Sequence, residues 1–313
     1  MLNIEEINRI INSINSHFNV ADDVEITLET NPDDLDKSKL QDLKNYSPIN
    51  RFSIGIQSFF DEDLVYLNRV HNAKHAIQVI ENSISVGFNN LSIDLIYGIP
   101  GLTVEKWKQN LKTFFDFGIN HLSSYSLTIE PKTALNTLIN KKKMAPVNEE
   151  ESVKQFKILV EETEKKGFIH YEISNFAKEG YYSKHNSIYW LGGHYVGFGP
   201  SAHSFNGVSR QWNVANMKQY INSVSSDNII LEKEQLTVNQ QYNEYIMTSL
   251  RTSWGCDTIH INNVFGSTYV SAFEKKALEF ILDGKIIKEV SVYKLTKTGK
   301  LFADGIASDF FIF

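Results

Sequence analysis

Hydrophobic residues along the first 130 residues follow two alternating periods. Apolar side chains recur at helical spacing in residues 3–18, which predicts an amphipathic helix. Residues 24–29 then alternate apolar with polar side chains, as a strand does, and a helix begins at Asp33-Asp34 and ends near Tyr46. The same order continues, with strands predicted at 51–57, 91–97 and 121–128 and helices at 73–86 and 103–117. Strands that alternate with helices predict an α/β fold with a parallel sheet.

The predicted strands each have one apolar face and one small or polar face. In residues 51–57, apolar side chains alternate with Ser53, Gly55 and Gln57. A parallel strand buried between two helix layers should be apolar on both faces. The pattern therefore favours a closed or partly closed barrel with a polar interior over a doubly wound sheet. Such barrels place functional residues at the carboxyl ends of their strands, where this sequence has Glu29, Gln57, Asp94 and Thr128.

Asp94 is the most informative of these residues, because a carboxylate inside an apolar strand needs hydrogen-bond donors to offset its desolvation. Together with Glu29, Gln57 and Arg69, it would suit a ligand that carries an ammonium, a carboxylate and hydroxyl groups. Each residue alone has an ordinary alternative, since a glutamate at a strand end is commonly solvated or caps a helix. The predicted site depends on their combination.

The pattern changes after residue 145. Residues 149–166 predict a charged surface helix and 168–173 a short strand, whereas 174–207 show little periodicity and predict a long loop. Helices predicted at 238–252, 258–264 and 268–282, followed by a hairpin through 286–295, suggest a small winged-helix-like domain. We therefore divide the chain into a barrel-type region (1–145), a middle region (146–233) and a C-terminal domain (234–313).

Three histidines lie within 34 residues of the middle region: His170 in HYEISNFA, His185 in HNSIYW and His203 in GFGPSAHS. An imidazole can ligate haem iron, and aromatic side chains can stack on a macrocycle. The simpler alternative is that each histidine is a hydrogen-bonded scaffold residue.

Composition excludes several classes of function. A net charge of −6 argues against a nucleic-acid surface, so the winged-helix-like end is better explained by a structural or protein-interaction role. No apolar run approaches the ~20 residues that span a bilayer, and charged residues near the N-terminus argue against a signal peptide. The single cysteine, Cys256, cannot form an internal disulfide and fits the cytoplasm. One thiolate also cannot build a zinc knuckle or a cysteine-ligated iron–sulfur cluster.

Several motifs occurring in order make the sequence similar to a known family. They are EITLETNP (25–32), RFSIGIQSF (51–59), LNRVH (67–71), IDLIYGIPG (93–101) and YSLTIEP (125–131), together with HYEISNFA and HNSIYW. The chain resembles the radical S-adenosylmethionine family of oxygen-independent coproporphyrinogen III oxidase-like proteins, and within it the haem chaperone branch. The resemblance covers nearly the whole chain and implies a part-open (β/α)6 barrel that binds S-adenosylmethionine at its strand ends.

The resemblance also implies roles for individual residues. Glu29, Gln57 and Asp94 would contact the ribose and methionyl part of S-adenosylmethionine, and Arg69 its carboxylate. Residues around Ile99 and Gly101 would border the adenine. In the haem chaperone branch the HNxxYW motif is linked to haem, which makes His185 the candidate axial ligand.

The sequence departs from the family pattern at its start. The three-cysteine motif for a [4Fe–4S] cluster and the glycine-rich turn of the family precede the helix with which this chain opens. We therefore expect a fragment or short form that lacks two barrel strands, makes no radical alone and binds S-adenosylmethionine weakly. The strand at 24–29 would be an open edge through which the chain could associate with itself.

Three functions stay open from the sequence. The first is a haem chaperone that binds haem and passes it to an acceptor protein. The second is a coproporphyrinogen III oxidase, and the third is a non-catalytic interaction module.

Overall fold

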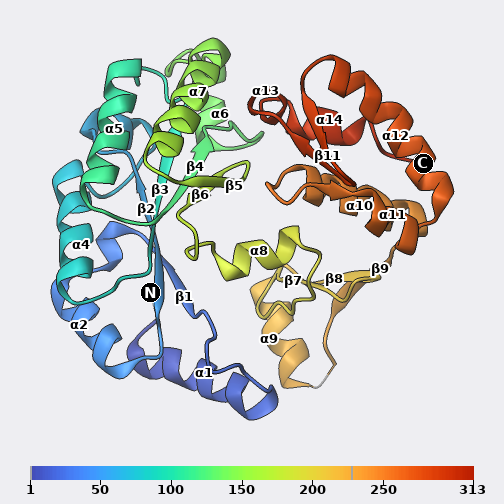
Figure 1. The fold of residues 1–313 in the computed structure, drawn as a ribbon. Helices are drawn as coiled ribbons and strands as arrows, with labels where there is room; N and C mark the ends of the chain where they lie inside the picture. Colours follow the sequence, from blue (N-terminus) through green and yellow to red (C-terminus); the bar gives the residue numbers. More distant parts are fainter. Residues whose placement is uncertain (1, 227) are drawn as a thin grey trace. The chain divides into compact units, whose positions relative to one another are not determined.

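The computed structural model describes residues 2–226 and 228–313 (Figure 1). The chain divides into two compact units. Unit 1 contains the described residues up to His170 together with Ser174–Tyr182, and unit 2 contains Tyr171–Ile173 and Ser183–Phe313. The predicted middle region, 146–233, is thus shared between the two units.

Unit 1 is built from helices that alternate with the strands of one sheet. Its helices are α1 (Ile4–His17), α2 (Lys37–Tyr46), α3 (Asp61–Tyr66), α4 (Ala73–Ser85), α5 (Val104–Asp116), α6 (Ala134–Asn140) and α7 (Glu149–Lys165), with a 3-10 turn at Pro32–Asp34. Its strands are β1 (Thr27–Thr30), β2 (Arg51–Gln57), β3 (Leu91–Tyr97), β4 (His121–Ser126) and β6 (Asn175–Ala177), and β5 (Ile169–Glu172) leads into unit 2.

The sheet of unit 1 has the strand order β1-β2-β3-β4-β6-β5. The pairs β1–β2, β2–β3 and β3–β4 are parallel, as the sequence predicts, and β4–β6 is antiparallel. Figure 1 shows α2, α4 and α5 along one side of this sheet. The mixed, mainly parallel sheet with its helices confirms the predicted α/β class and is consistent with a partial barrel.

The predicted strands at 51–57 and 91–97 have the predicted bounds, but the first strand begins later. The side chain of Asn50 accepts a hydrogen bond from the Ile26 N–H (2.8 Å) and donates one to the Val24 carbonyl (2.8 Å). These bonds take backbone groups that a longer β1 would use. The helix predicted from Asp33 is also divided, because Asp36 caps a new helix by accepting a hydrogen bond from the Lys39 N–H.

The apolar face of the sheet forms the core of unit 1. Phe52, Ile54, Ile56, Leu91, Ile93 and Leu95 are buried on it. The rings of Phe52 and Phe88 meet edge to face with centroids 4.4 Å apart. Because neighbouring parallel strands are in register, the opposite face gathers the polar side chains in the same way.

Unit 2 contains two small antiparallel sheets and several helices. Its strands are β7 (His203–Phe205), β8 (Ser209–Asn213) and β9 (Leu231–Gln235) in one sheet, and β10 (Cys256–Asp257), β12 (Val292–Leu295) and β11 (Ile286–Glu289) in the other. Its helices are α8 (Lys184–Trp190), α9 (Met217–Ser225), α10 (Val238–Leu250), α11 (Thr258–Val264), α12 (Ser267–Leu282), α13 (Lys297–Lys300) and α14 (Ala303–Ser308). The C-terminal helices and hairpin lie where the sequence predicts them.

The loop predicted over 174–207 is wrong, because this stretch contains β6, α8 and β7. These elements span only three to seven residues each, too short to show a hydrophobic period. β6 is held by pairing with the distant strand β4, whereas β7 pairs with its neighbour β8 in a hairpin. Sequence distance hid the pairing of β6, and the three residues of β7 are too few to show an alternation.

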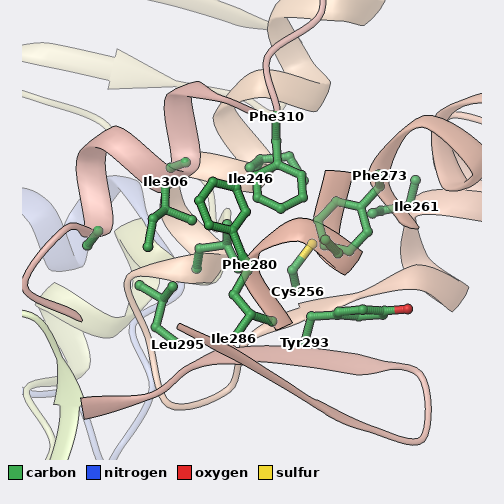
Figure 2. Packing of buried hydrophobic residues seen from close by; sticks show 14 of the residues in the cluster. Ile246, Cys256, Ile261, Phe273, Phe280, Ile286, Tyr293, Leu295, Ile306 and Phe310 are labelled. Atoms are coloured by element: carbon green, nitrogen blue, oxygen red, sulfur yellow. The ribbon is translucent and has the colours of Figure 1, made fainter. Parts of the chain in front are cut away.

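An apolar core holds the C-terminal half of unit 2 together. Figure 2 shows Phe273, Phe280 and Phe310 pointing toward one another, with Cys256 beside Phe273. The Phe310 ring stacks on Phe273 at 4.7 Å and on Phe280 at 5.7 Å. Helix α10 contributes Tyr242, Ile246 and Leu250 from one of its faces to the same core, which leaves its other face for a different role.

Candidate functional sites

The polar face of the unit 1 sheet collects side chains from neighbouring strands. The strand register pairs Glu29 with Ser53 and Asp94 with Ser123, so these polar side chains lie next to one another on the same face of the sheet. Arg51, Ser92 and His121 lie further toward the amino ends of their strands. We call this set the polar sheet face, and it confirms the predicted polar side of β2 and β3. The prediction is wrong for β4, because Ser123 pairs with Asp94 on this face, whereas Ser124 pairs with Leu95 on the other.

Asp94 is held within this face by hydroxyl groups. The Ser53 hydroxyl donates a hydrogen bond to Oδ1 of Asp94 at 3.3 Å. Burial raises the pKa of Asp94 to about 6, and Glu29 adds to the rise. Hydrogen bonds from Ser123 and Ser53 and the charge of Arg51 act in the opposite direction. Asp94 can therefore change its protonation near neutral pH, or bind a cationic group that would lower its pKa.

A buried arginine anchors the amino-terminal side of the polar sheet face. Arg51 is 4% exposed, and its Nε lies 3.8 Å from a carboxylate oxygen of Glu25. His121 lies nearby, with Nδ1 2.6 Å from the Ser92 hydroxyl. Burial lowers the pKa of His121 well below its usual value, and the charge of Arg51 lowers it further. This neutral imidazole acts as a hydrogen-bonding partner inside the sheet face.

Gln57 and Arg69 both lie near Asn31, which is close to Gly55. Arg69 Nη1 donates a hydrogen bond to the Asn31 side-chain oxygen at 3.3 Å. A Cβ on Gly55 would lie 2.6 Å from the Gln57 side-chain nitrogen and 3.3 Å from the same Asn31 oxygen. Gln57 itself has φ 69°, the left-handed region, at the register shift that ends β2. The missing side chain at Gly55 thus makes room for a close cluster of amide and guanidinium groups.

Three further predicted residues, Ile99, Gly101 and Thr128, lie beyond the ends of their strands. Ile99 is buried in the turn after β3, and Leu102 N–H donates to its carbonyl at 3.0 Å. Gly101 has φ 91° in the same turn, where its lack of a side chain is required. Thr128 is exposed beyond the end of β4, so it does not belong to the polar sheet face.

Two of the three histidines have clear structural surroundings. His170 stacks on Phe176 with ring centroids 4.1 Å apart, and its edge meets Phe156 at 5.9 Å. His203 is exposed on β7 and stacks on Trp212 at 5.8 Å. Both fit the scaffold alternative that the sequence left open.

The glycines before His203 also serve the scaffold. A Cβ on Gly197 would lie 2.3 Å from the His203 carbonyl oxygen, so the backbone approach there requires glycine. The Asn213 side chain donates hydrogen bonds to the carbonyls of Gly197 and Gly199. The GFGPSAHS motif therefore packs a turn against β8.

His185 is exposed on α8, and its ring meets Tyr189 edge to face at 5.0 Å. Ser183 caps this helix by accepting a hydrogen bond from the Asn186 N–H. The four-residue spacing places His185 and Tyr189 on one helix side. This exposed imidazole is accessible to a metal centre that approaches from solvent.

Unit 2 also contains a pocket with a volume of about 440 Å³. Seven aromatic side chains line it: Tyr189, Trp190, Tyr195, Phe205, Tyr245, Trp254 and Phe265. Gln241, Glu244 and Thr248 of α10 and Arg210 of β8 add polar groups. We call this site the aromatic pocket. The sequence gives little sign of this pocket, although residues 241, 244, 245 and 248 recur at helical spacing.

Cys256 belongs to the unit 2 core, where burial raises the pKa of its thiol. A buried neutral thiol does not fit a metal-ligating role, which requires a thiolate. Across residues 2–226 and 228–313, no cluster of three or more His, Cys, Asp and Glu side chains suits a metal ion. The same described ranges contain no helix long and apolar enough to cross a membrane.

Comparison with known proteins identifies relatives over nearly the whole chain. Residues 2–114 match the Radical SAM superfamily model. The chain is 32% identical over 311 residues to "Heme chaperone HemW" of Bacillus subtilis (strain 168), covering 99% of this chain and 82% of that protein. It is 27% identical to the protein of the same name from Mycobacterium tuberculosis (strain CDC 1551 / Oshkosh), covering 98% of this chain and 76% of that protein.

A solved structure shares the fold. It is described as "Coproporphyrinogen III oxidase (HemN) from Escherichia coli is a Radical SAM enzyme", and it matches with a TM-score of 0.81. The match covers 99% of this chain and 74% of the other at 21% sequence identity. At this identity the similarity shows the architecture alone.

Proposed function

This chain belongs to the radical S-adenosylmethionine family of oxygen-independent coproporphyrinogen III oxidase-like proteins, in its haem chaperone branch, and we propose that it binds haem and passes it to an acceptor protein. The observation that carries the proposal is the similarity to proteins named haem chaperones over 99% of the chain. The oxidase alternative has support from the fold only.

We propose His185 as the axial ligand of haem. Its imidazole is exposed on α8, and the ring of Tyr189 beside it restricts its orientation. His170 and His203 are less suited, because each stacks on an aromatic ring of its own unit. An exposed ligand on one side of the iron suits a cargo that must be handed on, since the acceptor can reach it.

We propose that the polar sheet face, together with Gln57 and Arg69, binds S-adenosylmethionine. The donor set fits the polar parts of this molecule: Asp94 and Glu29 for the ammonium and hydroxyl groups, Gln57 as an amide, and Arg69 for the carboxylate. The side chains of Gln57 and Asn31 occupy the space that a side chain at Gly55 would fill, and this close grouping of polar groups supports the same assignment. Ile99 and Gly101, in the turn that follows β3, would border the adenine.

When bound with its cluster in family members, S-adenosylmethionine supplies radical chemistry. The buried Cys256 thiol does not fit a cluster ligand, so we assign no electron-transfer step to the described residues. Their part is to bind and orient the polar groups of the molecule. Desolvation of Asp94 supports this part, because a cationic amino group would offset the cost of its charge.

The proposal includes a cytoplasmic location, supported by a single, buried and unpaired cysteine.

It also includes self-association through β1, which is the edge strand of the described sheet. Edge strands offer backbone N–H and C=O groups to another chain. A concentration series in analytical ultracentrifugation measures this association directly, and a monomer at every concentration would contradict it.

The haem proposal is tested by titration of the purified chain with haem, followed by the Soret band. His185→Ala should weaken binding at least tenfold, equivalent to about 1.4 kcal/mol, because an axial bond is lost. His203→Ala is the matched control, because this histidine is also exposed in unit 2. This variant should leave the titration unchanged. Equal binding by parent and His185→Ala would contradict the ligand assignment. Turnover of coproporphyrinogen III by the same protein would contradict the chaperone function.

A further inference from the structure

We infer that the aromatic pocket of unit 2 binds one edge of a tetrapyrrole by its conjugated ring and acidic substituent, independently of the metal. The inference rests on the proposed haem function and deepens it. It assigns the ring to Tyr189 and Trp190, the last two residues of HNSIYW, and to lining residues beyond that motif. His185 is not among the residues that line the pocket. Ring recognition and iron ligation are therefore separate tasks of unit 2.

Helix α10 is the element that builds the pocket. Its residues Tyr242, Ile246 and Leu250 are fully buried in the unit 2 core. The neighbouring stripe of Gln241, Glu244, Tyr245 and Thr248 lines the pocket instead. A helix with one face in a core and a second face on a pocket holds that pocket rigidly, which favours specific binding.

Aromatic rings reach the pocket in two connected groups. Tyr189 at the end of α8 contacts Tyr195 at 4.5 Å, and Tyr195 contacts Phe205 at 6.0 Å. On the side of the C-terminal helices, Tyr245 stacks on His260 at 4.3 Å. Phe265 lies 6.3 Å from the ring of Tyr245. Such a concentration of flat, polarisable surface favours a flat conjugated ligand over an aliphatic or sugar-like one.

Arg210 provides the partner for an acidic substituent. One nitrogen of its guanidinium, Nη2, lies 2.7 Å from Oε1 of Glu244, and the group lies over the ring of Phe205 at 5.8 Å. These contacts hold the guanidinium at the pocket wall. An arginine presents five N–H donors, and the ion pair uses those of one nitrogen, so donors remain for a ligand carboxylate.

Trp190 adds an unused donor to the same lining. Its indole N–H is buried and has no hydrogen-bond partner among the described residues. The guanidinium of Arg251 lies over its ring at 5.2 Å, which keeps the indole in place. A buried N–H without a partner costs free energy. A bound ligand with an acceptor group could recover that cost.

The volume of the pocket indicates how much of the ligand it holds. At about 440 Å³ it lies toward the lower end of the range for small-molecule sites. A tetrapyrrole with its side chains is larger than this space, so the pocket encloses one edge and leaves the rest exposed. Partial enclosure suits a carrier, because an acceptor protein can contact the exposed part before the ligand leaves.

The inference is tested with metal-free protoporphyrin IX, which has the ring and its carboxylates but no iron. The parent protein should shift the porphyrin absorption band and quench tryptophan fluorescence, because Trp190 and Trp254 line the pocket. Arg210→Met should weaken binding about tenfold, since a charge-assisted hydrogen bond is lost. Lys233→Met is the matched control, because it removes a positive charge from the neighbouring strand β9, and should leave binding unchanged.

Thr248→Phe tests the same pocket by steric filling and should also weaken binding about tenfold. Circular dichroism shows whether Thr248→Phe folds. If it does not, Arg210→Met alone tests the pocket, because the Arg210 side chain is 37% exposed and its replacement should not disturb the fold. His185→Ala should leave binding of the metal-free ring unchanged while weakening that of haem. This pattern separates the pocket from the iron ligand.

Two results would overturn the inference. The first is a parent protein that binds haem but not the metal-free porphyrin, which would leave the haem function intact. The second is binding of metal-free porphyrin that Arg210→Met and Thr248→Phe do not alter. A third result separates the two proposals. If the pocket variants weaken binding of the metal-free ring and His185→Ala does not change haem binding, the pocket is supported and the proposed iron ligand is overturned.

Discussion

The polar sheet face of unit 1 and the aromatic pocket of unit 2 differ in how they are prepared for a ligand. The sheet face contains charged groups that are buried at a cost, such as Asp94 with its raised pKa and Arg51 at 4% exposure. The aromatic pocket has its charges already paired, Arg210 with Glu244, and presents mainly rings. The first arrangement suits a small polar ligand that supplies the missing charge. The second suits a flat conjugated ligand whose acidic group meets the remaining N–H donors of Arg210.

The difference has a structural origin. Parallel strands in register bring side chains from distant parts of the sequence into rows, so a few polar positions per strand make a complete polar face. Unit 2 instead uses one helix, α10, to separate a core from a pocket. A sheet therefore defines the site of unit 1, and a helix defines the site of unit 2.

The largest expected effect tests whether the two units are stabilised separately. Phe273→Ala removes a buried ring from the core shown in Figure 2 and should cost about 3–5 kcal/mol of unfolding free energy. Phe114→Ala removes a fully buried ring from unit 1 and is its counterpart. Hydrogen exchange should show lost protection in residues 183–313 for the first variant and in residues 2–170 for the second. Equal loss in both units from either variant would contradict separate cores.

The second effect concerns the cost of the buried carboxyl in unit 1. Burial raises the pKa of Asp94 from 3.8 to about 6, so the folded protein keeps a proton that the unfolded chain has released. The stability from this proton is fully present below about pH 4 and is lost as the pH rises to about 6. Two pH units correspond to about 3 kcal/mol at most. Asp94→Asn should therefore unfold at a higher temperature than the parent at about pH 8, with a smaller difference near pH 4.

His121 makes the control for this measurement necessary. Burial lowers its pKa, so its contribution to stability is lost as the pH falls, opposite to that of Asp94. The parent and Asp94→Asn proteins share this contribution, and their difference isolates the carboxyl. A difference in unfolding temperature that does not vary with pH would show that Asp94 titrates normally.

The smallest effect concerns the space beside Gln57. Gly55→Ala places a methyl group within 2.6 Å of the Gln57 side-chain nitrogen, which must then move. We expect S-adenosylmethionine to bind about tenfold more weakly, equivalent to about 1.4 kcal/mol, in calorimetric titration. Gly305→Ala is the matched control: this exposed helix position in unit 2 has free space, so the change should stabilise the protein by about 0.5–1 kcal/mol without affecting the ligand. Unchanged affinity in Gly55→Ala, or no measurable binding by the parent, would contradict the proposed site.

The sequence predicted the parts of unit 1 that follow from local periodicity. Residues 51–57 alternate strictly and 91–95 do so as well, and each stretch lies in the strand that was predicted. Thr128 was misplaced because alternation does not mark the end of a strand, and β4 ends at Ser126. The motif residues Glu29, Gln57, Arg69 and Asp94 were singled out in advance. The roles of Asn31, Ser53 and Ser123 were not, because ordinary polar residues show no signal until their neighbours are known.

By itself, the sequence determined the alternating strands and helices, the polar side of β2 and β3, the single cysteine and the motifs of the family. These depend on residues that are close along the chain, so periodicity and spacing are enough to read them. Only the tertiary structure decided that 174–207 is folded, that His170 and His203 stack on their own aromatic partners, and that α10 carries a pocket. These features depend on which side chains meet in the folded chain, from near neighbours such as His203 and Trp212 to the separate elements that line the pocket. Periodicity does not record such contacts.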